Sequence, residues 1–418
     1  MPYFRTVGNV PHKRHTQFRQ ASGELYYEEM IGEEGFSSTF SLLYHRSVPA
    51  AFSGSDDWPL PDQALTPNHP IRLLHLKLHD LSYGDGSGDA SSDARAPDAV
   101  RDRRLVLGND DVRVSYVAAT APSPLCRNAI GDECLYIESG RAVLESVFGA
   151  VDAGEGDFVV IPRGTVHRWV PAGDGPLRAY CVEASSHIVP PARYLSRYGQ
   201  LTEFAPYSER DLFGPEEPLI REGRDVPVYT KHRGPGPGGI AGSVVYAARH
   251  PFDVDGWAGC LYPFRFNVAD FEPIVGRIHQ PPPVHQVWEG QNFVICAFVP
   301  RMADYHPDGI PVPYYHVNAD SDEVMFYCGG DYAARRGSGI GLGSVSVHPA
   351  GLGHGPMPGV MEKALGTTFH QELAIMIDTF RPLSLGEAGL ACADDGYATA
   401  AARVLDELDL SVDVRPGR

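Results

Sequence analysis

The sequence predicts a mainly β protein with two jelly-roll-like β-barrels, extra β structure at the N-terminus and a peripheral helix at the C-terminus. Three observations lead to this fold class. Short runs rich in Val, Ile, Tyr and Phe recur between Gly, Pro or Asp residues, as strands of a sandwich or barrel do. One order of strands, turns and polar motifs occurs twice. Helical periodicity is largely limited to the tail.

The predicted strands form two groups along the chain. The runs are 111–119, 134–140, 141–149, 157–164, 177–185, 292–300, 322–330, 343–351 and 373–380. The best helix candidate is the Ala- and Leu-rich tail segment GYATAAARVLDELDL, residues 396–410. It follows the last predicted strand, so we expect it to lie at the periphery.

Composition limits the possible functions. The chain has 418 residues, which predicts two domains or one domain with a large elaboration. Its 35 Lys and Arg against 53 Asp and Glu give a net charge of −18, so we expect neither nucleic acid nor an anionic membrane as a partner. No apolar run approaches the roughly 20 residues of a membrane helix, and residues 1–18 lack a signal-peptide core. We therefore expect a cytoplasmic protein with seven reduced, scattered cysteines.

Residues 126–169 and 316–356 follow one plan. In each, a polar loop ends in Asp-Glu, an apolar strand and a glycine turn follow, and a second strand leads to Pro, Gly and His. The matching pieces are Asp132-Glu133 with Asp322-Glu323, Gly156-Asp157 with Gly343-Ser344, and Pro162-x-Gly-x-x-His167 with Pro349-x-Gly-x-x-His354. The repeat indicates two copies of one β unit.

The repeat sets the expected domain boundaries. We expect an N-terminal β domain over 1–275, with a metal-free barrel at about 105–190, and a C-terminal catalytic domain over 276–418. The Gly-, Ser- and Asp-rich segment 83–99 and the Gly- and Pro-rich segment 232–240 are predicted surface loops.

The second copy carries a candidate metal site. His316, a carboxylate at 322 or 323, and His354 form a two-histidine, one-carboxylate set. Such a set leaves positions open on Fe(2+) and is typical of non-haem iron oxygenases. Because neighbouring strand residues point to opposite faces, only one of the two carboxylates can easily face the metal. We favour Glu323, with Asp322 as the alternative.

The first copy lacks the first histidine of this set. Cys126, Arg127 and Asn128 stand where His316 stands in the second copy. Two ligands seldom hold a metal, so we expect Glu133 and His167 to bond each other or backbone groups instead.

The repeat plan resembles the cupin double-stranded β-helix, and the whole chain resembles a bicupin. Four stretches resemble the homogentisate 1,2-dioxygenase family in its shorter bacterial form: KRHTQ…LLYHR (13–46), VIPRGTVHRW (160–169), GWAGCLYP (256–263) and PYYH…E…HPAG…HGP (313–356). The resemblance implies an Fe(2+)-dependent cleavage of homogentisate by O₂ to 4-maleylacetoacetate, in tyrosine and phenylalanine catabolism. It also implies a homo-oligomer, a trimer or hexamer. The spacing of five residues between the family's glutamate and its glycine again favours Glu323.

The resemblance also implies roles in the segment before the first ligand and around it. His279 best matches the family's catalytic base, and His285 is a second candidate. Tyr314 and Tyr332 match tyrosines that contact substrate. His348 is a candidate fourth metal ligand, or a residue that fixes a metal ligand through a hydrogen bond. His348 and His354 are also expected to contact the substrate. Arg335 and Arg336 are near enough to bind a substrate carboxylate, without a specified position.

Three alternatives remain at this point. A related dioxygenase could act on gentisate or another hydroquinone, although gentisate enzymes are expected to use three histidines. A non-catalytic bicupin that stores or binds a ligand would belong to a different class, and the intact His316, Glu323 and His354 set argues against it. A zinc or manganese cupin isomerase would be expected to present more histidines.

Overall fold

The computed structural model describes residues 3–83, 95–235, 238–332, 335 and 337–413. The chain forms two compact units. Unit 1 contains residues 1–63, 83–105 and 112–270, and unit 2 contains residues 64–82, 106–111 and 271–418. The expected division at residue 275 did not include residues 64–82 and 106–111 in the C-terminal domain, whereas the structure groups them with unit 2. Most of the predicted loop 83–99 (residues 84–94), residues 236–237 and Arg336 lie outside the described residues.

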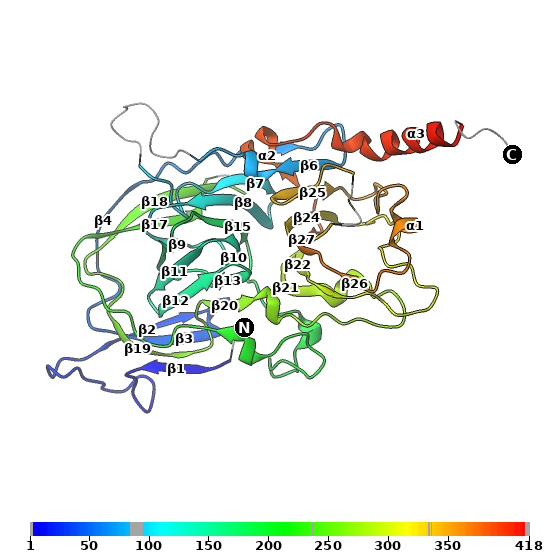
Figure 1. Ribbon diagram of the computed structural model, residues 1–418. Coiled ribbons are helices and arrows are strands. Elements are labelled where there is room, and N and C mark those ends of the chain that lie inside the picture. Colours follow the sequence, from blue (N-terminus) through cyan, green and yellow to red (C-terminus); the bar gives the residue numbers. More distant parts are fainter. Residues whose placement is uncertain (1–2, 84–94, 236–237, 333–334, 336, 414–418) are drawn as a thin grey trace. The chain divides into compact units, whose positions relative to one another are not determined.

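Unit 1 contains the first barrel, whose strands lie in two sheets (Figure 1). One runs in the order β16 (Leu212–Phe213), β20 (Phe264–Asn267), β13 (Asp157–Ile161), β10 (Glu133–Ser139), β15 (Leu177–Ala184) and β8 (Val112–Ala119). The other runs β12 (Gly149–Gly154), β11 (Arg141–Ser146), β14 (His167–Ala172), β9 (Leu125–Asn128), β17 (Val226–Arg233), β18 (Ile240–Ala247) and β4 (Phe52–Asp57).

The core of the first barrel lies between these sheets. Leu135 and Val159 come from one sheet and Leu144 and Trp169 from the other, and all four side chains are fully buried. Alternation along each strand places these residues on the inner face. An additional sheet gives the extra N-terminal β structure: β1 (Arg5–Gly8), β19 (Val254–Gly259), β3 (Phe40–His45) and β2 (Tyr27–Gly32).

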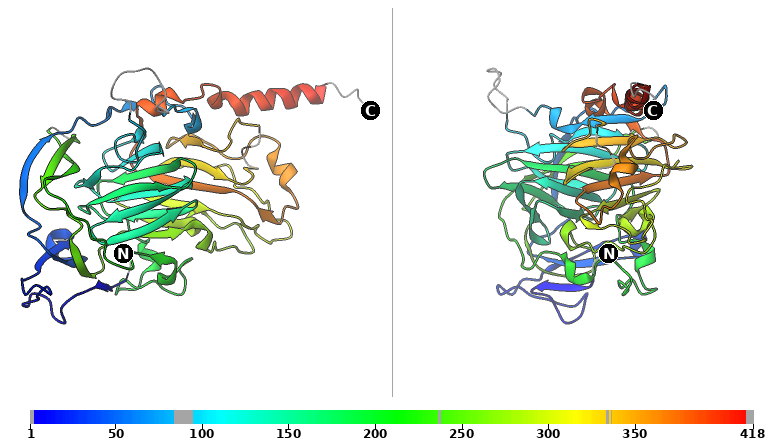
Figure 2. Two further views of the ribbon diagram at one scale, coloured as in Figure 1. Left: turned by 60° about the vertical axis from the view of Figure 1, so that its left-hand side comes forward. Right: turned by 45° about the vertical axis from the view of Figure 1, so that its right-hand side comes forward.

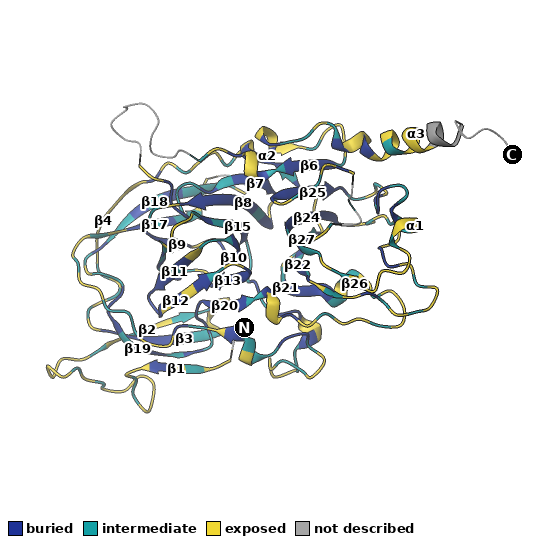
Figure 3. Ribbon diagram, in the orientation of Figure 1, coloured by how far each residue is buried: buried dark blue, intermediate teal, exposed yellow. Residues whose placement is uncertain are grey.

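Unit 2 is built on a six-stranded sheet. Its order is β21 (Gln286–Gly290), β22 (Phe293–Phe298), β27 (Leu373–Thr379), β24 (Asp322–Gly329), β25 (Ser344–His348) and β6 (Leu74–Lys77). The apolar strand β6 comes from far upstream and pairs with β25, which explains why residues 64–82 join this unit. Both β10 of unit 1 and β24 are buried along nearly all their length (Figure 3).

The remaining strands of unit 2 are short. β23 (Arg301–Met302) pairs with β26 (Phe369–His370), and β28 (Ser384–Leu385) pairs with β5 (Thr66–Pro67) and with residues 107–108 of β7 (Arg104–Gly108). Residues 303–321 form no strand in the described chain, apart from an isolated bridge between His316 and His354. One wall of the second barrel is therefore irregular.

Helices are few in the described chain: α1 (Val360–Ala364), α2 (Glu387–Ala391) and α3 (Ala400–Asp413), besides short 3₁₀ turns. The predicted tail helix forms as α3, a straight helix in Figure 2. Ala400 and Val404 pack against Val312 and Met357, whereas Leu405 and Leu408 are exposed. No helix among the described residues is long and apolar enough to cross a membrane.

The two units repeat the predicted plan in three dimensions. Gly164 and Gly351 match in the repeat and have φ angles of 85° and 82°. A side chain would be strained at this left-handed conformation, so both turns need glycine. The same cross-strand pairs also recur, with Cys126 opposite His167 and His316 opposite His354.

Candidate metal centre

Three predicted ligands come together in unit 2. Ligand atoms of His316, Glu323 and His354 all lie within 4.8 Å of one another. The Nε2 atoms of both histidines are 3.5 Å from the carboxylate of Glu323. Glu323 is on β24, whereas both histidines are in loops joined by two backbone hydrogen bonds of 2.9 and 3.0 Å. An isolated β-bridge between them, rather than a regular strand, holds both histidines.

Hydrogen bonds fix the tautomer of each histidine. The Nδ1 atom of His316 donates to the carbonyl oxygen of Tyr314 at 3.0 Å, and that of His354 donates to Leu352 at 3.1 Å. Each Nε2 must then present a lone pair toward Glu323. His354 Nε2 is buried and has no hydrogen-bond partner. Two lone pairs and a carboxylate directed at one point match a divalent cation, so these residues fit iron.

Asp322 points away from this centre. Its Oδ1 accepts the backbone N–H of Ala350 at 2.8 Å, and its Oδ2 accepts that of Leu383 at 2.7 Å. Both carboxylate oxygens are thus engaged in holding the loop after β25 and the segment after β27. The geometry favours Glu323 over Asp322 as the carboxylate ligand.

His348 forms a hydrogen bond with the Glu323 carboxylate. Its Nδ1 lies 2.8 Å from Glu323 Oε1, and its Nε2 lies 3.3 Å from the hydroxyl of Tyr397. Burial, together with the nearby Arg335 guanidinium, lowers the pKa of His348 to about 4, so the ring is neutral and donates its Nδ1 proton. Although burial alone would raise the pKa of Glu323, its contacts with His316, His348 and His354 lower it well below its usual range. Glu323 is therefore ionised at neutral pH.

In the first barrel, an arginine faces Glu133, the glutamate that corresponds to Glu323. Arg103 Nη1 lies 2.9 Å from Glu133 and 3.4 Å from Glu183. The histidine of this copy, His167, donates from Nδ1 to the carbonyl of Thr165 and places Nε2 3.2 Å from the Cys126 sulfur. His167 thus bonds a backbone group as expected, but Glu133 bonds Arg103 and the side chain of Asn128.

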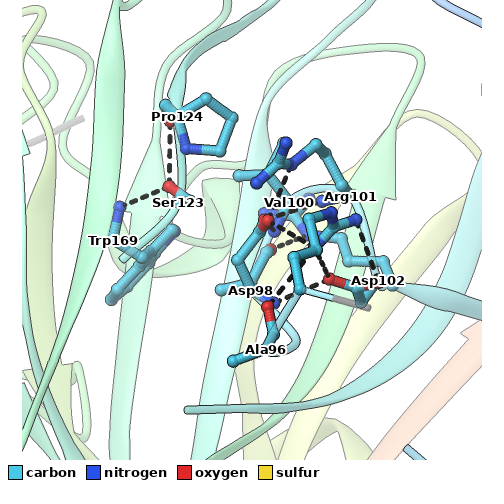
Figure 4. Close-up of polar contacts among 11 residues, drawn as sticks. Ala96, Asp98, Val100, Arg101, Asp102, Ser123, Pro124 and Trp169 are labelled. Atoms are coloured by element: carbon cyan, nitrogen blue, oxygen red, sulfur yellow. Dashed lines mark hydrogen bonds and ion pairs between the residues drawn. The ribbon is translucent and has the colours of Figure 1, made fainter. Parts of the chain in front are cut away.

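A tight turn closed by Asp98 and Asp102 comes directly before Arg103 in the chain (Figure 4 shows the turn). Asp98 accepts the backbone N–H groups of Val100 and Arg101, both at 2.9 Å, and its own N–H donates to Asp102 at 2.7 Å. Arg103 Nε then donates to the carbonyl of Ala99 at 2.8 Å. The turn fixes the guanidinium between the two buried glutamates.

A cavity of about 400 Å³ opens beside His316 and Glu323. Its wall includes the predicted His279, His285, Tyr314 and Tyr332. Among the described residues of that wall, His348 and His354 are not found; His348 is fully buried and its ring stacks on His354 with centroids 4.3 Å apart. These two histidines, which were expected to contact the substrate, therefore lie outside the cavity wall.

The two base candidates differ in their surroundings. His279 is partly exposed, its Nδ1 is 3.4 Å from Asp304, and its ring meets Tyr314 edge-on. His285 is buried against Phe298, and burial, with the Arg301 charge, lowers its pKa to about 3. A histidine this weakly basic is neutral at pH 7 and accepts protons poorly.

The cavity wall also includes Arg335, whose position the sequence did not specify, and Asp378, which the sequence did not indicate. Arg335 is half-buried and donates to the hydroxyl of Tyr327 at 3.1 Å and to the carbonyl of Gly355 at 2.8 Å. Asp378 on β27 is directly paired with Glu323 on the neighbouring strand β24. Burial, together with the charge of Glu323, raises the pKa of Asp378 to about 7. A single sequence offers no signal for Asp378, because only the strand register brings it beside the centre.

The chain is similar to a family model and to several known proteins. A family model described as a cupin domain matches residues 125–183. The homogentisate 1,2-dioxygenase of Bradyrhizobium diazoefficiens is 28% identical over 57% of this chain and 52% of its own, so the chain matches about half of that enzyme. A solved cupin 2 conserved barrel domain protein from Leptotrichia buccalis overlaps with a TM-score of 0.29 at 10% identity, over 69% of this chain and 92% of that one.

A protein of Saccharolobus solfataricus named "Putative dioxygenase SSO1533" is 35% identical over 91% of this chain and 94% of its own. The match therefore includes both barrels, whereas the cupin model matches a part of the first barrel alone. Identity at this level over nearly the full length of both proteins shows common family membership. The chain belongs to the family of this Saccharolobus protein, a family of cupin-type dioxygenases.

Proposed function

We propose that this protein is an Fe(2+)-dependent ring-cleaving dioxygenase that converts homogentisate and O₂ to 4-maleylacetoacetate. The observation that carries the proposal is the convergence of His316, Glu323 and His354 at one point, with His316 and Glu323 at the wall of a cavity large enough for a small aromatic acid. The dioxygenase family supports the reaction class, and the partial likeness to homogentisate dioxygenases supports the substrate.

Iron bound by His316, Glu323 and His354 would supply the positions at which the aromatic ring and O₂ meet. His348 and Tyr397 hold the Glu323 carboxylate in place through a hydrogen-bonded chain. The apolar wall around the ring, which includes Met325 and Met376, limits water in the cavity.

The substrate carboxylate would bind at Arg335. This residue is half-buried on the cavity wall, and the partners that its guanidinium has among the described residues are the neutral Tyr327 hydroxyl and Gly355 carbonyl. A guanidinium that faces a cavity without a carboxylate partner can pair with an anionic substituent of the ligand. Tyr332, on the same wall, would contact the acid as well.

His279 is the stronger candidate for the base that takes a phenolic proton. Asp304, 3.4 Å away, can orient its ring and stabilise the imidazolium that forms. His285 would then act as a neutral hydrogen-bonding group on the cavity wall.

The test uses full-length protein loaded anaerobically with Fe(2+). We expect O₂ uptake equimolar with homogentisate, with the absorbance of maleylacetoacetate appearing at the same rate. Gentisate and unsubstituted hydroquinone complete the panel. Turnover of gentisate but not homogentisate would reject the substrate, and no O₂ uptake with any of them would favour a non-catalytic binding protein.

A further inference from the structure

Each barrel places a second carboxyl group directly opposite its ligand-position glutamate. In unit 1 Glu183 pairs with Glu133 across β10 and β15, and in unit 2 Asp378 pairs with Glu323 across β24 and β27. Directly opposed residues project from the same face of a sheet. Asp378 accordingly shares the cavity wall with Glu323.

The first barrel shows what such a pair of carboxylates needs. Glu183 is compensated by Lys231, and Arg103 lies between Glu183 and Glu133. Both acids are buried, and a buried carboxylate is tolerated when a cation or hydrogen-bond donors face it.

The second barrel has no such compensation for Asp378 within the described chain. Its Oδ1 atom is buried without a hydrogen-bond partner. The charged groups that act on it are Glu323, which repels it, and His316. The cationic Arg335 is directed instead at Tyr327 and Gly355. A hydrogen-bond donor on a molecule that enters the cavity would satisfy this oxygen.

We infer that Asp378 accepts a hydrogen bond from a ring hydroxyl of the bound substrate. The inference rests on the proposed function and deepens it, because it selects ligands with a second hydroxyl on the ring. Iron would engage one hydroxyl through the ligand set, Arg335 would hold the carboxylate, and Asp378 would recognise the hydroxyl that remains. A monophenolic acid would leave the carboxyl group of Asp378 buried and without this hydrogen bond.

The test is anaerobic calorimetric binding to the Fe(2+)-loaded protein, which needs no turnover. The ligands are homogentisate and two analogues that each lack one hydroxyl, 2-hydroxyphenylacetate and 3-hydroxyphenylacetate. In the unmodified protein we expect one analogue to bind about 10- to 100-fold more weakly than homogentisate, the range for a hydrogen bond to a charged group. In Asp378→Ala the ratio of the dissociation constants of this analogue and of homogentisate should fall to about 3-fold or less.

Two further variants complete the design. Asp378→Asn keeps the shape of the side chain if Asp378→Ala fails to fold, and it should also reduce the ratio. Glu183→Gln, at the same register in the first barrel, should leave the ratio unchanged. Iron content should remain as in the unmodified protein in both Asp378 variants.

Other outcomes would overturn the inference. An unchanged ratio in Asp378→Ala and Asp378→Asn would show that no hydroxyl contacts this residue. Loss of iron in these variants would make Asp378 a metal ligand instead. Absence of O₂ uptake with every hydroquinone acid, with the binding ratio intact, would reject the proposed reaction and leave the recognition of the hydroxyl standing.

Discussion

Asp322 and Glu323 are neighbours in the chain, yet their carboxyl groups serve opposite faces of β24. Asp322 accepts two backbone N–H groups, from Ala350 and Leu383, while Glu323 faces the two ligand histidines. Asp132 and Glu133 divide their roles in the same way, since Asp132 accepts the N–H groups of Arg163 and Ile188. One acid of each pair holds loops together, and the other faces the barrel interior.

The metal set predicts which substitutions remove iron. His316→Ala, Glu323→Ala and His354→Ala each delete one of three ligands, so bound iron should fall from near stoichiometric to background after reconstitution. Elemental analysis of the desalted protein measures this. His12→Ala, an exposed histidine of unit 1, is the matched control and should retain iron. Retention of iron by Glu323→Ala would reject the ligand assignment.

Asp322→Ala should affect stability rather than the metal. It leaves two backbone N–H groups without their acceptor, which we expect to lower the free energy of unfolding by about 2–4 kcal/mol. Chemical denaturation measures the change, and the folded variant should still bind iron. Asp132→Ala offers the same test in the first barrel. Iron loss without destabilisation in Asp322→Ala would reverse the roles of the two acids.

Arg103→Met should destabilise the first barrel. The substitution leaves Glu133 without its buried cationic partner and Glu183 with Lys231 alone, a loss of about 3–5 kcal/mol for broken buried pairs. Denaturant unfolding gives the magnitude, and iron content should not change. Adding Glu133→Gln should restore part of the stability. An unaltered unfolding midpoint in Arg103→Met would show that the ion pairs are dispensable.

Arg335→Met should weaken recognition of acids specifically. Loss of a charge-assisted contact to carboxylate predicts a KM for homogentisate raised by about 10- to 100-fold, with hydroquinone turnover little changed. Steady-state O₂ uptake with both substrates measures the difference. Arg72→Met, which removes an exposed arginine paired with Asp395, is the control for charge. Equal effects on both substrates would point to a folding defect instead.

The stability of unit 1 should fall as pH rises above neutrality. Burial lowers the pKa of His45, but hydrogen bonds to Asp253 at 2.6 Å and Glu29 at 3.1 Å outweigh it and raise the pKa to about 9. A raised folded-state pKa gives stability that is complete below about pH 6.5 and is lost as pH rises through about 9. The change is on the order of 3 kcal/mol.

Denaturant titrations between pH 6 and pH 10 measure this dependence. His45→Gln has no titrating imidazole, so it should be less stable at pH 6 and should lose the decline associated with this group. A decline of the same size in His45→Gln would assign the effect to other residues.

The sequence by itself determined the parts of this protein that local pattern encodes. Alternating apolar runs and positive-φ glycines such as Gly164 and Gly351 fix strands and turns within a few residues, and the repeat made His316, Glu323 and His354 the metal candidates. Comparison of the copies also indicated Cys126 in place of a histidine. These inferences need only residue type and spacing.

Tertiary structure decided what depends on contacts between distant segments. Upstream strand β6 joins the sheet of unit 2, Arg103 reaches Glu133 and Glu183 from a separate turn, and Asp378 meets Glu323 only through the register of β24 and β27. His348 shows the same limit, because spacing placed it near the ligands but burial behind Glu323 separated it from the cavity. Spacing along a chain sets which residues are near in sequence, whereas strand pairing and burial set which side chains share a face and a dielectric environment.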